Sequence, residues 1–297
     1  MPFSRYIDKL TDKFQEHIPP QLQNAIKTPA VPSSGKSSAT SVSIYWSADF
    51  SQSTAVSANF KHECGDWGWG NNELENYTDS EENSFHTQEK CLVLRAVVAS
   101  AKVRDKYTSA RLRTHQTLAK RRGYLEATIS SPSAKGIWPA FWLLPSEPFK
   151  WPEDGEIDIM ESWNRNTLNH CCLHWGHFAG EDMSKHRVRE VEVSSITKPH
   201  IYGFAWDQPE SGEGGRMLWY IDGRPVMKAT RPGGMRRLED FQVILNVAIG
   251  GNVCNGALPE DGSYEMVVRD LKMCESPDGG WECFEREWLR TREGHGY

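Results

Sequence analysis

The chain has 297 residues, of which 38% are hydrophobic and 25% charged, and its formal net charge at pH 7 is −6. This composition is typical of a folded globular protein and argues against a disordered chain. The net negative charge argues against a nucleic-acid partner, because nucleic-acid-binding proteins usually carry a basic face. No apolar run approaches the roughly 20 residues that a membrane helix needs, so we expect no transmembrane segment.

Residues 1–41 predict an N-terminal extension and linker. Apolar residues recur every four positions within 3–17, which predicts a short amphipathic helix, and the Ser, Pro, Ala and Gly of 28–40 indicate a linker. The charged residues of the first 15 positions leave no continuous apolar core, so the segment does not resemble a signal peptide. We therefore expect a cytoplasmic protein, with unconventional export as the alternative.

From residue 42 to 275 the pattern changes to short strands separated by turns. The clearest strands are expected at 124–129, 217–221, 224–228, 243–249 and 264–274. Asp222 and Gly223 between two of them predict a hairpin, because Asp-Gly supplies the positive φ angles of a tight two-residue turn. Many short strands with Gly-rich and Pro-rich turns, and no long helical pattern, predict an all-β sandwich or barrel.

The C-terminal residues 276–297 predict a tail that packs back on this domain. Trp281, Phe284, Trp288 and Leu289 are spaced as in a short helix with one apolar face. The seven cysteines show no C-x-x-C spacing, and without a secretion signal we expect reduced thiols. A bridge from Cys254 or Cys274 to a partner is the alternative.

Three acidic residues occur in one apolar stretch, EIDIME at 156–161. In a regular strand Glu156 and Asp158 share a face, and the isoleucines between them face the other way. Glu161 lies five positions after Glu156, so it rejoins the acidic face only if the strand contains an extra residue. We expect a β-bulge at Met160 to supply it, since bulges often redirect side chains next to active sites.

Three carboxylates on one face repel each other unless they share protons or bind something. A solvated strand face and a calcium site are the alternatives to a catalytic role. Glycoside hydrolysis requires one ionised carboxylate and one protonated carboxylic acid on either side of the scissile bond. A third acid between them can raise the pKa of the proton donor.

Twelve tryptophans accompany the acidic segment, and aromatic rings suit the C–H faces of sugars. Trp138, Trp142, Trp151 and Trp163 surround it in the sequence, while Trp67 and Trp69 lie in a Gly-rich loop. A place in the core is the alternative for each single tryptophan. Trp151, which stands in a Pro-containing loop, is a better cleft residue than Trp142 in its apolar run.

These segments resemble glycoside hydrolase family 16, and most of all its laminarinase-type endo-β-1,3(4)-glucanases. EIDIME at 156–161 is similar to the bulged form of the family signature. Further similar segments are WGNNELENYT at 69–78, YTSAR at 107–111, GIWPAFWLLP at 136–145 and LNVAIGG at 245–251. They occur in order from about residue 44 to 274, so the resemblance covers nearly all of the chain except its ends.

The resemblance implies a β-jelly-roll sandwich of the concanavalin/lectin-like kind, with a concave cleft for a β-glucan substrate. It implies a retaining mechanism in which Glu156 is the nucleophile, Glu161 the acid/base and Asp158 a residue that tunes the pair. Sugar contacts are implied for Asn72, Trp138, Trp142, Trp151 and His174. We expect a raised pKa for Glu161 and a lower one for Glu156, hence a bell-shaped pH profile. We expect a monomer without a cofactor.

Several alternatives remain beside this interpretation. A transglycosylase of the same family would use the same residues, and a glucan-binding module would need no acids at all. Family members often bind structural calcium through an Asp of the last strand; Arg269 stands there in this sequence, so we expect no such metal. His170, Cys172 and His174 share one strand face and could ligate zinc, although we favour His174 in the sugar cleft and the cysteines in the core.

Overall fold

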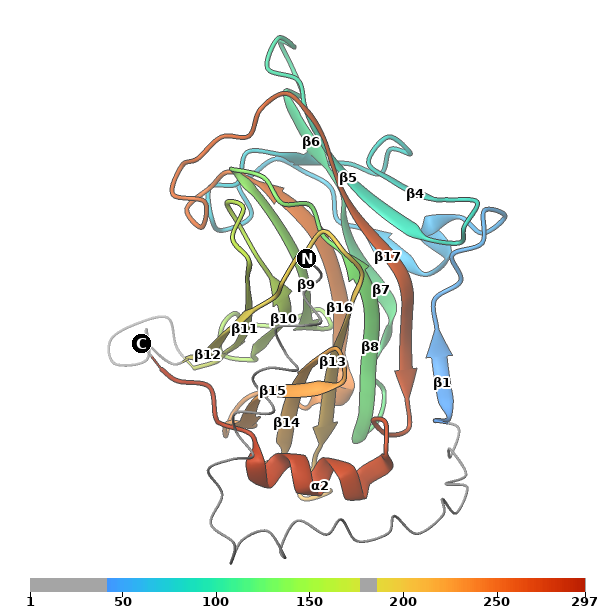
Figure 1. Cartoon of the computed structure of the whole chain (residues 1–297), viewed down its shortest axis with the longest axis vertical. Helices are drawn as coiled ribbons and strands as arrows, with labels where there is room; N and C mark the ends of the chain where they lie inside the picture. Colours follow the sequence, from blue (N-terminus) through green and yellow to red (C-terminus); the bar gives the residue numbers. More distant parts are fainter. Residues whose placement is uncertain (1–41, 177–185, 297) are drawn as a thin grey trace, which may run out of the picture. The chain divides into compact units, whose positions relative to one another are not determined.

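The structure, a computed structural model, describes residues 42–176 and 186–296. The helix and linker expected within residues 1–41 lie outside the described residues. From Val42 onward the chain forms one unit built almost entirely of β-strands (Figure 1).

Two β-sheets make up this unit. The first runs in the order β15 (Arg224–Thr230), β14 (Arg216–Ile221), β13 (His200–Asp207), β8 (Arg122–Ser130), β17 (Gly262–Cys274), β5 (Leu92–Val98), β6 (Tyr107–Ser109) and β3 (Asn76–Tyr77), with β1 (Ile44–Ser47) on β17 and β4 (Ser84–His86) on β5. The second runs in the order β12 (His186–Glu192), β11 (Leu168–His174), β10 (Glu156–Glu161), β9 (Ile137–Pro145), β16 (Phe241–Ile249), β7 (Arg111–Thr117) and β2 (Phe60–His62). Neighbouring strands are antiparallel except β3 and β6, which are parallel. Short 3-10 turns occur at η2 (Val56–Ala58) and η4 (Leu238–Asp240).

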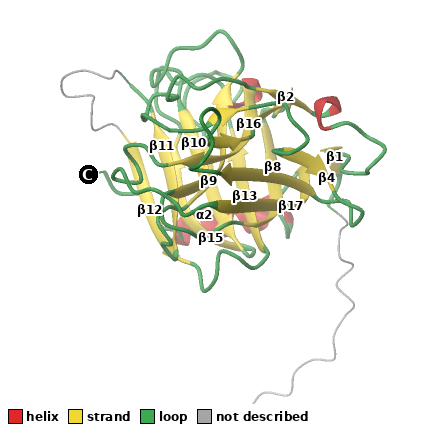
Figure 2. Cartoon of the chain, turned by 90° about the horizontal axis from the view of Figure 1, so that it is seen from above, coloured by secondary structure: helices red, strands yellow, loops and turns green. Residues whose placement is uncertain are grey.

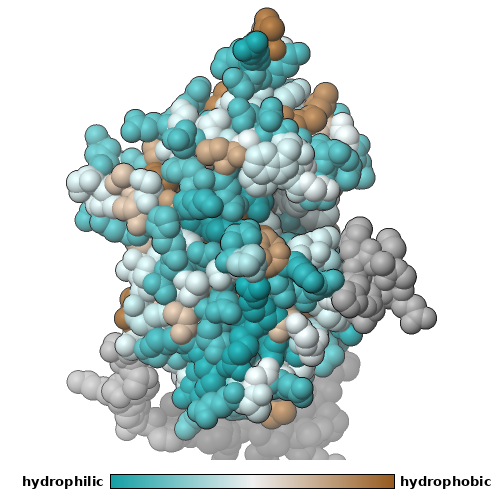
Figure 3. Space-filling view, turned by 180° about the vertical axis from the view of Figure 1, so that it is seen from behind, coloured by the Kyte–Doolittle hydropathy of each residue, from teal (hydrophilic) through white to brown (hydrophobic). Residues whose placement is uncertain are grey.

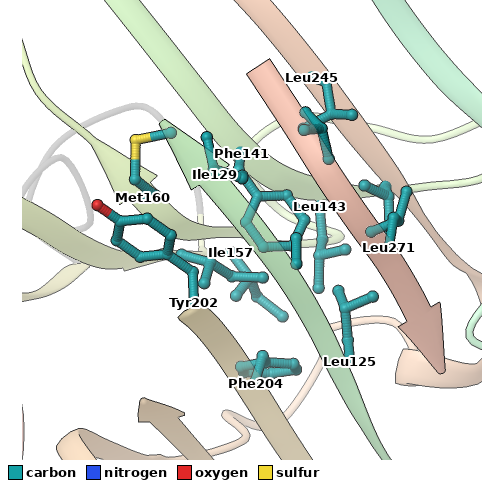
Figure 4. Close-up of a cluster of buried hydrophobic side chains, with 14 of the residues drawn as sticks. Leu125, Ile129, Phe141, Leu143, Ile157, Met160, Tyr202, Phe204, Leu245 and Leu271 are labelled. Atoms are coloured by element: carbon teal, nitrogen blue, oxygen red, sulfur yellow. The ribbon is translucent and has the colours of Figure 1, made fainter. Parts of the chain in front are cut away.

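The two sheets pack face to face around one hydrophobic core, as the view from above shows (Figure 2). Leu125 and Leu271 of the first sheet meet Phe141, Ile157 and Leu245 of the second, and all five are fully buried (Figure 4). Because side chains alternate along a strand, the second sheet's other face is left for polar residues. The fold is the all-β sandwich that the sequence predicts. The face seen in Figure 3 is mainly hydrophilic.

The expected strands and hairpin are confirmed. Tyr220 and Ile221 pair with Pro225 and Arg224, so Asp222 and Gly223 form a two-residue turn with φ angles of 50° and 71°. Asp and Gly are among the few residues that readily adopt positive φ angles, which explains why this pair occupies the turn.

Helix α2 (Gly280–Arg290) lies against the outer face of β13 and β14 (Figure 1). Phe284 is fully buried against Tyr124 and Tyr220, and Oη of Tyr220 donates a hydrogen bond to Glu287 at 2.8 Å. Leu289, expected on the packed face, is 80% exposed, because the helix turns it to solvent. Among the described residues no helix has the length and apolarity to span a membrane.

The seven cysteines are described as free thiols. Cys254 and Cys274, the two considered for a bridge to a partner, are buried, at 0% and 2% exposure. Arg269 lies at an irregularity between β17 and β8, where it donates a hydrogen bond to Oγ of Ser130 at 2.8 Å. The neighbouring Asp270 pairs with Lys272 at 2.7 Å. The Arg269 guanidinium is thus engaged in a hydrogen bond within the first sheet.

Candidate active site

The acidic strand β10 contains the bulge that the sequence requires. Asp158 pairs with Trp142 of β9 and Met160 pairs with Phe141, so two steps on β10 correspond to one on β9. Ile159 is the residue without a counterpart on β9, one position before the predicted Met160. Both are buried in the core, and the extra residue returns Glu161 to the face of Asp158.

The three acids line one cavity of about 310 Å³ on the outer face of the second sheet. Its walls come from β7, β9, β10 and β16 and from two loops. The lining residues are Trp69, Gly70, Asn71, Glu73, Arg111, Trp138, Ala140, Trp142, Leu144, Phe149, Trp151, Glu156, Asp158, Glu161 and Asn246. The cavity thus combines aromatic rings with carboxylates, as a sugar-binding site requires.

Two tryptophans fix the outer two acids. Nε1 of Trp151 donates a hydrogen bond to Oε2 of Glu156 at 3.0 Å, and Nε1 of Trp138 donates one to Oε1 of Glu161 at 2.9 Å. Trp151 is 46% exposed, so it can bond the carboxylate and still present ring surface to a ligand. Each of these two carboxylates accepts its indole hydrogen bond at one oxygen, so its second oxygen is not engaged by a tryptophan.

His174 of β11 lies beside the acidic strand, because Glu156 pairs with His174 and Asp158 with Cys172. Nε2 of His174 is 3.4 Å from Oδ2 of Asp158 and 3.8 Å from Oε1 of Glu156. Asp158 is 2% exposed, and Nε1 of Trp219 donates a hydrogen bond to its main-chain oxygen at 2.9 Å. The middle acid is therefore enclosed, and an imidazole is its nearest cation.

Burial and mutual repulsion raise the pKa of both outer acids. Loss of solvation, followed by the charge of Asp158, raises the pKa of Glu156 to about 7. The same causes, with the charge of Glu156 added, raise the pKa of Glu161 well above its ordinary value. Burial disfavours protonated His174, but Asp158, Glu156 and Glu161 outweigh it and raise the pKa of His174 to about 9. The pKa of Glu156 is thus itself raised, because the strand buries this carboxyl next to a second carboxylate, while Glu161 is repelled by both neighbouring acids.

A hydrogen-bonded chain organises the opposite wall. Nε1 of Trp142 donates to Oδ1 of Asn246 at 2.7 Å, and Nδ2 of Asn246 donates to Oη of Tyr77 at 3.0 Å. Oη of Tyr77 in turn donates to Oε2 of Glu73 at 3.1 Å. Satisfied buried networks of this kind rigidify a site.

Arg111 joins the same wall. Its guanidinium lies over the rings of Trp69 and Trp142, 4.8 Å and 4.7 Å from their centroids. Its Nε also donates a hydrogen bond to Oε2 of Glu63 at 2.7 Å. The two ring contacts and the ion pair hold Trp69 and Trp142 in fixed positions on the cavity wall.

Five residues were expected to contact sugar, and the structure separates them. Trp138, Trp142 and Trp151 line the cavity. His174 is not among its lining residues and instead contacts the carboxylates. Asn72 is exposed, has a φ of 55° and donates a hydrogen bond to Asn252 at 3.1 Å. This left-handed turn directs Asn72 away, and its neighbours Asn71 and Glu73 line the cavity in its place.

Some lining residues were not singled out from the sequence. Arg111, Asn246 and Glu73 lie inside the segments that carry the family resemblance but were given no role. Asn246 offered a signal, because it is a polar residue within the apolar run of β16. Glu73 gave none, because its burial depends on the loop before β3 folding over the sheet.

An antiparallel sandwich that holds paired carboxylic acids in a tryptophan-lined cavity is the arrangement of a glycoside hydrolase. Comparison with known proteins agrees with this class. A family description of the catalytic domain of glycoside hydrolase family 16, XgeA-like, matches residues 70–200. The glucan endo-1,3-beta-glucosidase of Cryptopygus antarcticus is 31% identical over 218 residues, which cover 67% of this chain and 76% of that protein. This chain therefore belongs to glycoside hydrolase family 16.

Two further similarities extend this result. The clotting factor G alpha subunit of Tachypleus tridentatus is 33% identical over 70% of this chain, but the match covers 30% of that protein. The laminarinase catalytic domain of Thermotoga maritima MSB8 superposes with a TM-score of 0.66 at 27% identity, over 79% of this chain and 98% of that domain. The chain spans about a third of the length of some curated relatives, 30% and 35% in two of them.

Proposed function

We propose that this protein is an endo-acting, retaining β-glucanase that hydrolyses β-1,3-linked glucan, with mixed β-1,3/1,4-glucan as a further substrate. Residues 42–275 would form the catalytic domain, with 1–41 as an extension and 276–297 as a tail packed on it. The observation that carries the proposal is the pair Glu156 and Glu161 in one cavity, each fixed by one indole N–H. We expect the protein to act as a monomer without a nucleic-acid partner.

The proposed reaction has two steps. Glu156 attacks the anomeric carbon while Glu161 gives its proton to the glycosidic oxygen, which breaks the bond and leaves a covalent glycosyl-enzyme. Glu161, now ionised, takes a proton from water, and the hydroxide attacks the anomeric carbon and releases Glu156. Oε1 of Glu161 is occupied by Trp138, so Oε2 is the oxygen that would carry the proton.

Asp158 and His174 would set the charge of this pair. The buried negative charge of Asp158 favours the protonated form of Glu161, as a proton donor requires. The positive charge of protonated His174 lowers the pKa of Glu156. It therefore favours the ionised form that Glu156 needs as a nucleophile. The environment therefore allows one acid to be charged while the other stays neutral.

A second depression beside the carboxylate cavity supports a polymer as the substrate. This depression, of about 620 Å³, shares Phe149 with the carboxylate cavity and continues along the loop at 148–154. Adjacent depressions can hold several sugar units on one side of the cleaved bond. The name laminarinase on the Thermotoga maritima domain and the name of the Cryptopygus antarcticus enzyme support β-1,3-glucan as that polymer.

A reducing-sugar assay on laminarin, barley mixed-linkage glucan, agarose and cellulose tests the proposal. We expect short oligosaccharides from laminarin, fewer from mixed-linkage glucan, and no release in the Glu156→Gln variant. If an added oligosaccharide acceptor becomes longer in the presence of the protein, the protein is instead a transglycosylase. Binding to laminarin without any cleavage by the folded wild-type protein would contradict the proposal and indicate a binding module.

The pH profile of kcat/KM should be bell-shaped with its acidic limb near neutrality. Glu156 must be ionised to attack, and its pKa of about 7 means that activity falls as pH drops through that value. Glu161 must be protonated, so its strongly raised pKa places the alkaline limb higher still. Initial rates on laminarin between pH 4 and pH 10, about the span of ordinary side-chain pKa values, provide the measurement. Full activity near pH 5, where ordinary carboxyl groups are about 80% ionised or more, would contradict it.

A further inference from the structure

We propose that Asp158, Cys172 and His174 form a binding site for a thiophilic divalent cation such as Zn²⁺, and that its occupation inhibits the enzyme. The binding site itself does not depend on the proposed glucanase activity. The inhibition does, because it requires Glu156 to be the nucleophile.

The strand pairing brings the three ligands together. Cys172 of β11 lies directly opposite Asp158 of β10, and His174 follows two positions later on the same face. One carboxylate oxygen of Asp158, Sγ of Cys172 and one nitrogen of His174 all lie within 4.8 Å of one another. Two of the separations involve Nε2 of His174: 3.2 Å to Sγ of Cys172 and 3.4 Å to Oδ2 of Asp158.

These separations match the edges of a tetrahedral zinc site. Zinc binds thiolate at about 2.3 Å and imidazole or carboxylate at about 2.0–2.2 Å, so two such ligands lie roughly 3.3–3.6 Å apart. Nε2 of His174 is therefore already close to the correct distance from both other donors. Small side-chain shifts would suffice to place a cation among the three.

The carboxylate oxygen at the centre of the group lacks a hydrogen-bond donor. Oδ2 of Asp158 is buried and, within 42–176 and 186–296, accepts no hydrogen bond of good geometry; its contact with Nε2 of His174, at 3.4 Å, is an ion pair. Buried polar oxygens almost always have a partner, so an oxygen of this kind directed at a thiol and an imidazole is a candidate metal ligand. The position of Oδ2 is an observation independent of Cys172.

The donor set selects the class of cation. Thiolate and imidazole favour zinc and its thiophilic neighbours, whereas calcium and magnesium prefer oxygen ligands alone. Cys172 and the imidazolium of His174 would each lose one proton to solvent on binding, because the ligands are the thiolate and the neutral imidazole. His170, considered with Cys172 and His174 from the sequence, stacks on Trp163 at 4.0 Å and does not join this group.

A cation at this position would interfere with catalysis. Oε1 of Glu156 is 3.8 Å from Nε2 of His174, so the proposed nucleophile borders the site and can supply a fourth ligand. A coordinated or electrostatically held Glu156 attacks a sugar poorly.

The first readout is direct and uses Co²⁺ as a spectroscopic probe for Zn²⁺. Wild-type protein should bind one Co²⁺ with a thiolate-to-cobalt charge-transfer band that Zn²⁺ displaces. Cys172→Ala should lose this band, and Cys172→Ser serves as the second variant should the alanine variant fail to fold. Cys64→Ala, which removes an exposed thiol, is the matched control and should retain the band. A band that persists without Cys172, or its absence from the wild-type protein, would overturn the site.

The second readout is inhibition of laminarin hydrolysis, with each variant compared with its own rate in the presence of a chelator. Loss of an outer-shell partner already weakens metal binding by about 10–100-fold, so removal of the thiolate itself should raise the inhibitory Zn²⁺ concentration by at least about 100-fold. Cys64→Ala should be inhibited like the wild type. Equal zinc sensitivity with and without Cys172 would overturn the inhibitory role. If the wild type shows no hydrolysis at all, the cobalt spectrum still decides the site, so the two failures are distinguishable.

Discussion

Glu156→Gln is expected to lower kcat on laminarin by on the order of 10⁴-fold or more, as removal of a catalytic nucleophile generally does. The glutamine side chain has nearly the same shape and can still accept the hydrogen bond from Nε1 of Trp151. It cannot form the covalent bond to the anomeric carbon, because an amide is a very weak nucleophile. The loss should therefore fall on kcat, with laminarin binding retained.

The alanine variant Glu156→Ala, whose side chain is smaller, tests directly whether Glu156 is the nucleophile. In Glu156→Ala the space beside Trp151 can admit azide, which would attack from the side of the missing carboxylate and give a glycosyl azide of inverted configuration. The thermal midpoint of both variants should be no lower than that of the wild type, because the substitutions remove a carboxylate that repels Asp158. Wild-type rates in Glu156→Gln would refute the assignment of the nucleophile.

Glu161→Gln is expected to lower the rate on laminarin by roughly 10²–10⁴-fold, the usual contribution of a general acid or base. The hydrogen bond from Trp138 can persist, since the glutamine oxygen still accepts it. The variant lacks only the proton that the leaving sugar needs. A substrate whose leaving group departs without a proton should therefore escape most of the loss in the first step.

An aryl β-laminaribioside with a dinitrophenolate leaving group distinguishes the two acids. Glu161→Ala should release an initial burst of dinitrophenolate and then stall, because no base activates water for the second step. Azide should restore turnover and give a product of retained configuration, opposite to that of Glu156→Ala. Equal loss on the aryl substrate and on laminarin would show that Glu161 is not the proton donor.

Local patterns in the sequence were sufficient to predict the strands and the acidic face. Alternation at 243–249 predicted β16, Asp222-Gly223 predicted the hairpin, and the five-residue interval between Glu156 and Glu161 required a bulge. These features depend on side-chain period and turn geometry, which act over a few residues. The family resemblance supplied the roles, since three acids on a strand do not define a reaction.

Contacts between distant segments were decided by the tertiary structure alone. Cys172 reaches Asp158 only because β11 pairs with β10 in one register, and Asn72 turns away because its loop takes a left-handed step at that residue. The pKa of Glu156 rises to about 7 because the folded sheet buries it beside Asp158. The sequence by itself indicated the candidate catalytic acids; burial and strand register, which are long-range properties, decided their surroundings and their neighbours.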